Sequence, residues 1–257
     1  MNDVRTWAAR LDDAATARQP VAPLSKDGLT DVTAAYQVQN ALVRHRLSRG
    51  DRLVGGKLGL TSRAKQIAMG VDKPLYGMVT SGMLRVSGTR LSSRELIHPR
   101  VEPEIAFVLG EALEGPDVTV ADVLAATRYL SPALDVIDSR YEGFSFTHVD
   151  AIADNASSAV FALGDDLVAP HGDLALTGCV LEVDGQVVES AAGAAVMGHP
   201  AAAVAFLANQ LAFAGKRLEA GWVVLSGGLT APVPLRPGIT VTATVSGLGS
   251  VTLGAEQ

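Results

Sequence analysis

Short runs of apolar residues, separated by glycines and other turn residues, extend from Leu53 to the C-terminus and constrain the fold more than any other feature. A run such as 101–109 has the length and aliphatic content of a β-strand. Asp184 and Gly185, between two stretches of alternating apolar residues, predict a two-residue hairpin, and residues 245–253 predict a second. We therefore expect a core dominated by strands.

The first fifty residues have a different periodicity. Apolar residues recur at the spacing of one helix face within residues 4–11 and again within 35–43, and a polar loop separates the two stretches. Thr30 or Asp31 is expected to cap the second helix. The N-terminal segment is therefore predicted to be two helices joined by a loop.

Helices are also predicted within the strand region, at residues 62–70, 119–130 and 199–215. Strands and helices alternate irregularly, without a repeated strand–helix unit, so the α+β class is favoured over a doubly wound parallel sheet. We expect a small N-terminal helical segment, residues 1–52, followed by a mixed β catalytic core, residues 53–257.

Charge and composition restrict the possible functions. The formal net charge is −6 and the pI is near 5.3, without a cluster of lysines and arginines, which argues against nucleic-acid or anionic-membrane partners. The single cysteine, Cys179, excludes an internal disulfide and a cysteine-based metal site. The N-terminus does not resemble a signal peptide, and no window has the length of a membrane span. We expect a cytoplasmic protein that acts on a small molecule.

Two glutamates interrupt an apolar strand in the sequence VEPEIAF. Alternate side chains of a strand share a face, so Glu102 and Glu104 point the same way, with Cα atoms about 6.5–7 Å apart. Asp135 lies in a second apolar run, PALDVID. Buried acids this close repel each other unless a cation lies between them, and a divalent ion such as Mg²⁺ suits oxygen ligands. The alternative is a solvated strand face.

Other polar residues are candidates on weaker grounds. Lys57 stands among glycines and aliphatic residues in VGGKLGL, where a lysine either extends to the surface or lies beside an anion. Asn155, Ser157 and Ser158 precede an apolar strand and fit either a substrate site or ordinary turn and capping chemistry. The glycines of SGGLT, residues 226–230, could let backbone amides approach a ligand.

Motifs spread over nearly the whole chain form a specific pattern. They are KLGLTS (57–62), GVDKPLYG (70–77), HPRVEPEIAFVLG (98–110), PALDVIDSRY (132–141), ADNASSAVFALG (153–164), GHP (198–200) and SGGLTAPVPLRPG (226–238). Together they resemble the hydratase and decarboxylase branch of the fumarylacetoacetate hydrolase superfamily. The resemblance implies a fumarylacetoacetate-hydrolase-like mixed β-structure with a metal-dependent active site.

Carried onto this sequence, the resemblance implies that Glu102, Glu104 and Asp135 bind Mg²⁺ or Mn²⁺. Lys57 is the implied active-site lysine, and Ser158 or Ser157 is the implied serine in contact with the substrate. Asp135 departs from the branch, which usually has glutamate at this position. The shorter side chain could shift the ion or leave room for a water.

The resemblance also favours one reaction. Pro103, between the two glutamates, and the Tyr-x-x-Phe-x-Phe run at residues 141–146 are more similar to the decarboxylases than to the hydratases. We expect decarboxylation of 2-oxo-3-hexenedioate (4-oxalocrotonate) to 2-hydroxypenta-2,4-dienoate and CO₂, in the meta-cleavage degradation of aromatic compounds. One alternative is hydration of 2-hydroxypenta-2,4-dienoate. A non-catalytic partner subunit is another, against which the intact Glu102, Glu104 and Lys57 argue.

The expected substrate, a 2-oxo dicarboxylate, has oxygens that further side chains would have to bind. Ser158 and Asn155, with Ser157, would orient its oxygens. Arg140 is a candidate for its distal carboxylate, since a buried arginine can bind a carboxylate through two N–H groups. A salt bridge from Arg140 to Asp138 or Glu142 is the alternative. A homo-oligomer is expected, and a complex with the hydratase of the same pathway is conceivable.

Overall fold

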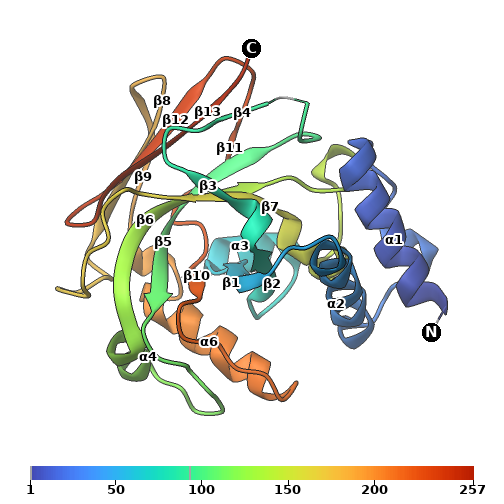
Figure 1. The fold of residues 1–257 in the computed structure, drawn as a ribbon, viewed down its shortest axis with the longest axis horizontal. Coiled ribbons are helices and arrows are strands. Elements are labelled where there is room, and N and C mark those ends of the chain that lie inside the picture. The colour runs from blue at the N-terminus through green and yellow to red at the C-terminus, as the bar shows by residue number, and fades with distance from the viewer. Residues whose placement is uncertain (1, 93) are drawn as a thin grey trace.

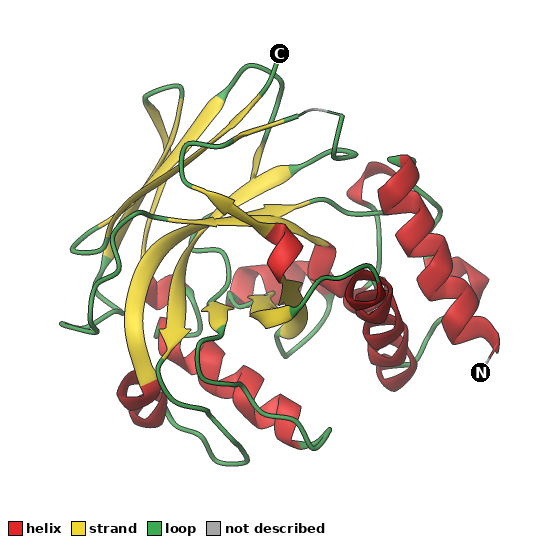
Figure 2. Cartoon of the chain, viewed as in Figure 1, coloured by secondary structure: helices red, strands yellow, loops and turns green. Residues whose placement is uncertain are grey.

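The computed structural model describes residues 2–92 and 94–257, and it combines α-helices with two β-sheets (Figure 1). Figure 2 shows the strands gathered at the upper left and centre of the view, with helices below and to the right. The predicted α+β class is confirmed. Helices occupy most of the chain before Leu53, where the first strand begins.

The larger sheet has the strand order β2-β1-β10-β5-β6-β7-β3, and β11 pairs with the first residues of β5. Neighbours β1 and β10 are parallel, whereas β5 is antiparallel to both β10 and β6. The strands are β1 (Leu53–Gly59), β2 (Leu75–Thr80), β3 (Leu84–Val86), β5 (Arg100–Leu109), β6 (Thr127–Ile137), β7 (Ser158–Leu163), β10 (Val223–Leu225) and β11 (Val233–Pro234). Segments far apart in sequence therefore meet around β5.

The smaller sheet has the order β4-β13-β12-β8-β9 and contains both predicted hairpins. Its strands are β4 (Arg90–Leu91), β8 (Gly178–Val183), β9 (Gln186–Ala192), β12 (Thr240–Val245) and β13 (Gly249–Ala255). Asp184 and Gly185 join β8 to β9 with φ of 48° and 77°, the positive values that a type I′ turn requires. The second hairpin joins β12 to β13, with Val245 opposite Gly249. Both hairpin predictions are confirmed.

The two sheets enclose an apolar core. One face of β5 points into this core, and the other face can carry polar residues. Val101 on β5 and Leu134 and Val136 on β6 pack against Leu181 and other residues of the smaller sheet. Because side chains alternate along a strand, the residues on either side of Val101 point to the opposite face of the larger sheet. Glu102 and Glu104 belong to that opposite face.

The N-terminal helices form a second apolar cluster. Helices α1 (Asn2–Ala17) and α2 (Val32–Ser48) pack together and against α5 (His148–Ala153). The Asp31 side chain accepts a hydrogen bond from Ala34 N, so it is the N-cap of α2. The predicted two-helix segment is confirmed by these elements, and α5 extends it with a helix from the middle of the chain.

The remaining helices are α3 (Arg63–Met69), α4 (Val120–Ala126) and α6 (Pro200–Ala212). Helices α4 and α6 pack together and beside β6 and β1 of the larger sheet, and α3 reaches β5 through the ion pair of Lys65 with Glu102. His199 caps α6. The helix expected over residues 119–130 ends at Ala126, so the prediction is wrong for the last residues. Thr127 already belongs to β6, where pairing with Leu109 of β5 outweighs local helical periodicity.

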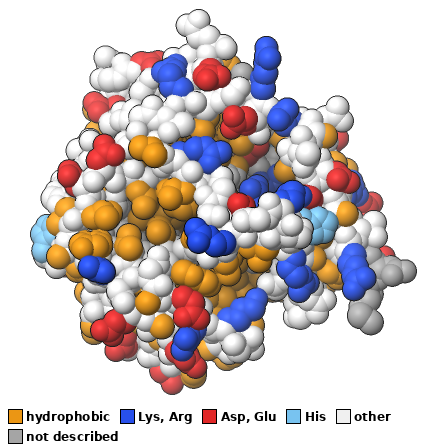
Figure 3. Space-filling model, in the orientation of Figure 1, with side chains coloured by type: hydrophobic (Ala, Val, Ile, Leu, Met, Phe, Trp, Pro, Cys, Tyr) orange, Lys and Arg blue, Asp and Glu red, His pale blue; other side chains and the backbone are white. Residues whose placement is uncertain are grey.

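The lengths of the helices and the distribution of surface charge can be compared with the expectations from composition. In the described part of the chain, no helix combines the length and apolarity needed to cross a bilayer. Figure 3 shows basic and acidic side chains interspersed over the visible face, with hydrophobic side chains gathered over the region of β5 and β6. The net charge of −6 is therefore not concentrated as a single patch on this face.

Candidate metal centre

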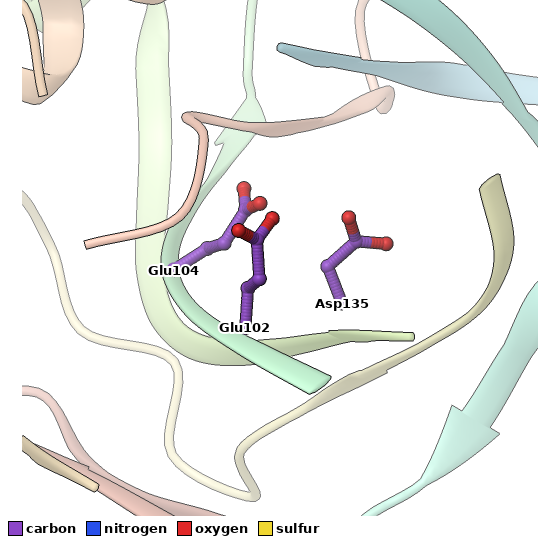
Figure 4. Close-up of side chains that lie close together, drawn as sticks. All are labelled: Glu102, Glu104 and Asp135. Carbon is purple, nitrogen blue, oxygen red and sulfur yellow. The ribbon is translucent and has the colours of Figure 1, made fainter. Parts of the chain in front are cut away.

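Three carboxylates from two neighbouring strands meet on the face of the larger sheet that points away from the smaller sheet. Glu102 and Glu104 lie on β5, and Asp135 lies on β6 directly opposite Glu102. One oxygen of each lies within 4.8 Å of an oxygen of the others, and Figure 4 shows the three side chains converging on one space. Glu104 and Asp135 are both 0% exposed. The alternative of a solvated strand face is therefore wrong for this group.

Two lysines are paired with these carboxylates. The Lys57 ammonium on β1 forms an ion pair with Asp135 Oδ2, and Lys57 is 1% exposed, so it does not extend to the surface. The Lys65 ammonium on α3 lies 2.6 Å from Glu102 Oε1. Sequence reasoning missed Lys65. A cation in the first turn of a helix opposes the helix dipole and could have indicated a nearby anion.

Several oxygens at this site have no protein partner. Among the described residues, the buried side-chain atoms without a hydrogen bond are Glu104 Oε1, Asp135 Oδ1, Thr61 Oγ1 and Ser226 Oγ. Leaving such groups unpaired in a protein interior costs about 1–3 kcal/mol each, and more when they are charged. Unpartnered carboxylate oxygens side by side are the donor set that a hard divalent cation requires. The residues present therefore fit such an ion.

The glycines of the SGGLT motif allow the backbone to approach the carboxylates. The Gly227 amide donates a hydrogen bond of 2.6 Å to Glu104 Oε2. Gly227 has φ of +103°, and a side chain there would meet Thr61 Oγ1 at 2.4 Å. A Cβ on Gly228 would lie 2.7 Å from Glu102 Cδ. No residue with a side chain fits either position without moving the site.

Burial and the repulsion between neighbouring acids raise the pKa values of Glu104 and Asp135. Burial raises the pKa of Glu104 well above its usual value, the negative charge of Asp135 raises it further, and the Lys57 ammonium opposes both effects. Burial also raises the pKa of Asp135, against the opposing effect of Lys57. Burial lowers the pKa of Lys65, but the charge and hydrogen bond of Glu102, together with the charges of Glu104 and Asp135, raise it above its ordinary value. Three carboxylates therefore face two lysine ammonium groups, and a bound cation would relieve their mutual repulsion.

The other predicted substrate residues have protein partners. The Asn155 side chain forms two hydrogen bonds with the Met78 backbone, both 2.8 Å long. The Ser157 hydroxyl donates to Asp154 Oδ2 at 3.2 Å, and the Ser158 hydroxyl lies 3.6 Å from Met83 Sδ. These contacts fit the turn and capping alternative. A role in substrate binding stays a prediction.

Arg140 is buried in a structural network. Its guanidinium pairs with the Asp154 carboxylate and donates to the backbone carbonyls of Asp138 and Ser158. The alternative prediction, a salt bridge from Arg140 to Asp138 or Glu142, is wrong about the partner, because Arg140 pairs with Asp154. The Asp138 carboxylate instead accepts from the Ile97 and His98 amides. With these bonds in place, a contact between Arg140 and substrate stays a prediction.

A cavity lies in another part of the molecule from the three carboxylates. A cavity of about 1260 Å³ opens between α2, the start of β1 and the end of α6, where Leu47, Leu53 and Trp222 are among the residues that line it. None of the predicted site residues lines this cavity. Its size alone therefore does not make it the reaction site.

Comparison with known proteins agrees with the fold. The Fumarylacetoacetate (FAA) hydrolase C-terminal family matches residues 58–253. A 4-oxalocrotonate decarboxylase of a Pseudomonas species is 43% identical over 244 residues, which are 95% of this chain and 94% of that protein. The TodF product hydratase of Pseudomonas putida F1 is 41% identical over 254 residues, covering 97% of this chain and 94% of the hydratase.

A solved structure extends the similarity to the whole fold. The structure of 4-oxalocrotonate decarboxylase from Pseudomonas putida G7, complexed with magnesium and adipate, matches with a TM-score of 0.95 at 40% identity. The match covers 99% of this chain and 97% of that chain. It includes the N-terminal helices as well as the strands that carry Glu102, Glu104 and Asp135. The chain therefore belongs to the fumarylacetoacetate hydrolase family.

Proposed function

We propose that this protein decarboxylates 2-oxo-3-hexenedioate (4-oxalocrotonate) to 2-hydroxypenta-2,4-dienoate and CO₂, as a carboxy-lyase of aromatic catabolism. The observation that carries the proposal is the buried group of Glu102, Glu104 and Asp135, with unpartnered oxygens on Glu104 and Asp135. The choice of reaction is supported by 4-oxalocrotonate decarboxylases at 43–45% identity, against hydratases at 38–41%.

The three carboxylates would hold one Mg²⁺, or Mn²⁺ in its place. Such an ion supplies Lewis acidity, which stabilises negative charge on an oxygen of a bound substrate. Asp135, shorter than the glutamate usual at this position, lies directly opposite Glu102 on the neighbouring strand, which keeps its oxygens within reach of the other two acids. All three ligands stand on paired strands, so the protein holds them at fixed separations.

Lys57 would place a second positive charge near the C2 oxygen of the substrate. In the reaction the C5–C6 bond breaks, its electrons move through C4 and C3, and negative charge develops on the C2 oxygen until it is protonated. A cation held in a dry site near that charge commonly contributes a few kcal/mol. The Lys57 ammonium is buried and is fixed by its ion pair with Asp135, so it meets that requirement.

Ser158 is the proposed polar contact for the substrate, with Ser157, Asn155 and Arg140 as further proposed contacts. Within the described residues, the Ser158 hydroxyl has one weak contact, with Met83 Sδ, so it can rotate toward a bound oxygen. Asn155, Ser157 and Arg140 would first have to exchange hydrogen bonds that they make within the protein. Ser158 is therefore favoured among them.

Hydration of 2-hydroxypenta-2,4-dienoate is the second candidate, because it uses the same carboxylates and the same electron sink. The test is to incubate the protein and Mg²⁺ with 2-oxo-3-hexenedioate while following CO₂ release, and separately with 2-hydroxypenta-2,4-dienoate. We expect CO₂ release in the first reaction. Turnover of the dienoate alone would replace the decarboxylase proposal with the hydratase, and inactivity on both would favour a non-catalytic subunit.

We further propose that the protein is a homo-oligomer. Strand β9 is an edge strand of the smaller sheet, and it exposes Val187 and Val188 at 64% and 45%. An exposed apolar edge strand is a ready surface for pairing with another copy. Light scattering coupled to gel filtration tests this, and a monomeric mass would contradict it. A complex with the pathway hydratase stays a prediction, tested by gel filtration of the two mixed proteins.

A further inference from the structure

Arg100 shares the face of β5 that carries the candidate metal ligands. It begins the strand two residues before Glu102 and four before Glu104, so the three side chains alternate onto one face. The register supports this placement, because Arg100 lies opposite Ile137 on β6 as Glu102 lies opposite Asp135. Arg100 is therefore about 6.5–7 Å along the strand from Glu102, measured between Cα atoms.

Arg100 differs from the other cations near the site in lacking an anion. Lys57, Lys65 and Arg140 each form an ion pair with a carboxylate. No ion pair of Arg100 with another described residue is found. Its guanidinium carbon lies instead 4.2 Å from the centre of the Phe144 ring. Stacking occupies the face of the guanidinium and leaves the N–H groups at its edge available for a planar acceptor such as a carboxylate.

The Phe144 ring that supports Arg100 is itself held in place. It lies against His98, with ring centroids 4.7 Å apart and the rings tilted by 44°, and its centroid is 6.1 Å from that of Phe146. Tyr141 in turn lies 6.1 Å from Phe146. Tyr141, Phe144 and Phe146 form the Tyr-x-x-Phe-x-Phe run, the part of the sequence that favoured a decarboxylase over a hydratase. The structure gives this run a physical role as a platform for Arg100.

The separation along β5 matches the length of a six-carbon dicarboxylate. With carbon–carbon bonds of about 1.5 Å, the two carboxyl carbons of such a chain are roughly 6 Å apart when it is extended. A substrate whose 2-oxo acid end lies at Glu102, Glu104 and Asp135 therefore reaches the Arg100 region with its other end. The five-carbon substrate of the hydratase has no carboxylate there.

We propose that Arg100, stacked on Phe144, binds the distal carboxylate of the substrate and makes the site selective for dicarboxylates over monocarboxylates. The assignment rests on the proposed function and replaces Arg140, whose guanidinium is already bonded to Asp154. As the C5–C6 bond breaks, the distal carboxylate leaves as neutral CO₂. The electrons of that bond form a C4–C5 double bond, the C3–C4 double bond shifts to C2–C3, and the negative charge moves to the C2 oxygen. The ion pair with Arg100 is thus strongest in the ground state, so its loss raises KM and does not lower kcat.

The test compares adipate with hexanoate, two six-carbon chains that differ by one carboxylate. Binding of each to the Mg²⁺-loaded protein is measured by calorimetry. We expect the wild type to prefer adipate by about 10–100-fold, as for a charged hydrogen-bonded pair. Arg100→Met is expected to remove the preference through loss of adipate affinity alone, and Phe144→Leu to lower it by about 3–10-fold. In kinetics, Arg100→Met raises KM for the dicarboxylate by a similar factor and leaves kcat equal to that of the wild type or higher.

Arg128→Met is the matched control, because Arg128 also stacks on an aromatic ring, that of Tyr129 at 5.2 Å, but lies exposed near the start of β6. This variant should keep the full adipate preference. An unchanged Mg²⁺-induced rise in Tm shows that Arg100→Met is folded with its metal site intact. A wild type without the preference, or an Arg100→Met variant that keeps it, overturns the proposal. The binding result stands apart from the proposed function, whose failure would appear as absent CO₂ release.

Discussion

Glu104 is the residue where the electrostatic demands of the site are greatest. It is fully buried, one of its oxygens has no partner, and burial together with the charge of Asp135 raises its pKa. We expect Glu104→Gln, which keeps the side-chain size, to lower Mg²⁺ affinity by on the order of 100-fold or more, since changes outside the ligand shell alone cost 10–100-fold. Metal-dependent turnover should be lost with it.

Calorimetric titration with Mg²⁺ measures this loss, and circular dichroism checks that the variant is folded. Glu111→Gln is the control, since Glu111 follows the same strand but is exposed. Its Mg²⁺ affinity should equal that of the wild type. Unchanged affinity in Glu104→Gln would remove this glutamate from the metal site.

Among the connecting segments, the tight turn at Asn155–Ser157 has an unusual backbone. All three residues have φ between 53° and 55°, in the left-handed region that L-residues avoid. The Asn155 side chain compensates by bonding both the amide and the carbonyl of Met78 in β2. Asn155→Ala leaves these two buried groups unpaired and places a less suitable residue in the left-handed region. We expect it to lower the free energy of unfolding by about 2–4 kcal/mol.

Urea denaturation of the metal-free protein checks this value. The matched variant is Asn40→Ala, which removes an asparagine from the middle of α2, where alanine is favoured. Its free energy of unfolding should change by less than about 0.5 kcal/mol. Equal losses in the two variants would show that the bonds to Met78 do not stabilise the turn.

The contact between α1 and α2 gives a prediction about pH. Two hydrogen bonds of 2.6 and 2.7 Å join the Arg49 guanidinium to Asp12, and His45 Nδ1 lies 3.3 Å from Asp12 Oδ2. Burial raises the pKa of Asp12, but the Arg49 hydrogen bonds and charge outweigh it and hold the pKa below its ordinary value. Because Arg49 is about half exposed, we expect Asp12→Asn to cost only about 1 kcal/mol at pH 7.

A depressed pKa in the folded state stabilises the protein above the unfolded pKa of about 3.9, and that stability is lost as pH falls through the lower folded value. The difference between wild type and Asp12→Asn should therefore be constant from pH 5 to 7 and shrink below about pH 4. Urea midpoints across this range measure it. Asp13→Asn, at the exposed neighbouring position, should show no such trend, and a difference independent of pH would contradict the role of the Asp12 charge.

At the scale of the whole molecule, local patterns explain what could be predicted. Hairpins at Asp184–Gly185 and near the C-terminus, helix boundaries such as Asp31, and the shared face of Glu102 and Glu104 depend on residues close in sequence. These predictions agree with the structure. The ends of α4 and β6 depend instead on pairing with β5, and local periodicity misplaced them.

Non-local contacts explain what the sequence left open. Lys57 on β1 meets Asp135 on β6 because β10, from near the C-terminus, joins β1 to β5 in the same sheet. Lys65 meets Glu102, and Arg140 meets Asp154, through the packing of helices and turns that carry no shared motif. A charged residue inside an apolar run can be recognised from the sequence as unusual. The residue that it pairs with depends on the order of the strands in the sheet, which the sequence does not show directly.

The whole fold should respond to the metal, because the candidate ligands lie on the two central strands β5 and β6. In the metal-free state, Glu104 and Asp135 keep buried unpartnered oxygens, which a bound cation would satisfy. An ion that binds only the folded state stabilises it by about 2.7 kcal/mol when its concentration is 100 times its Kd. For a chain of this size that corresponds to a rise in Tm of about 5–10 °C.

Differential scanning calorimetry in Mg²⁺ and in excess EDTA measures the shift, and it also separates specific binding from a general effect of salt. A general effect screens exposed charges and acts equally on any variant with the same surface, whereas the specific effect requires the buried carboxylates. Glu104→Gln, whose changed residue is fully buried, should therefore retain less than about 2 °C of the rise at the same Mg²⁺ concentration. An equal rise in the wild type and this variant would place the stabilising ion elsewhere in the molecule.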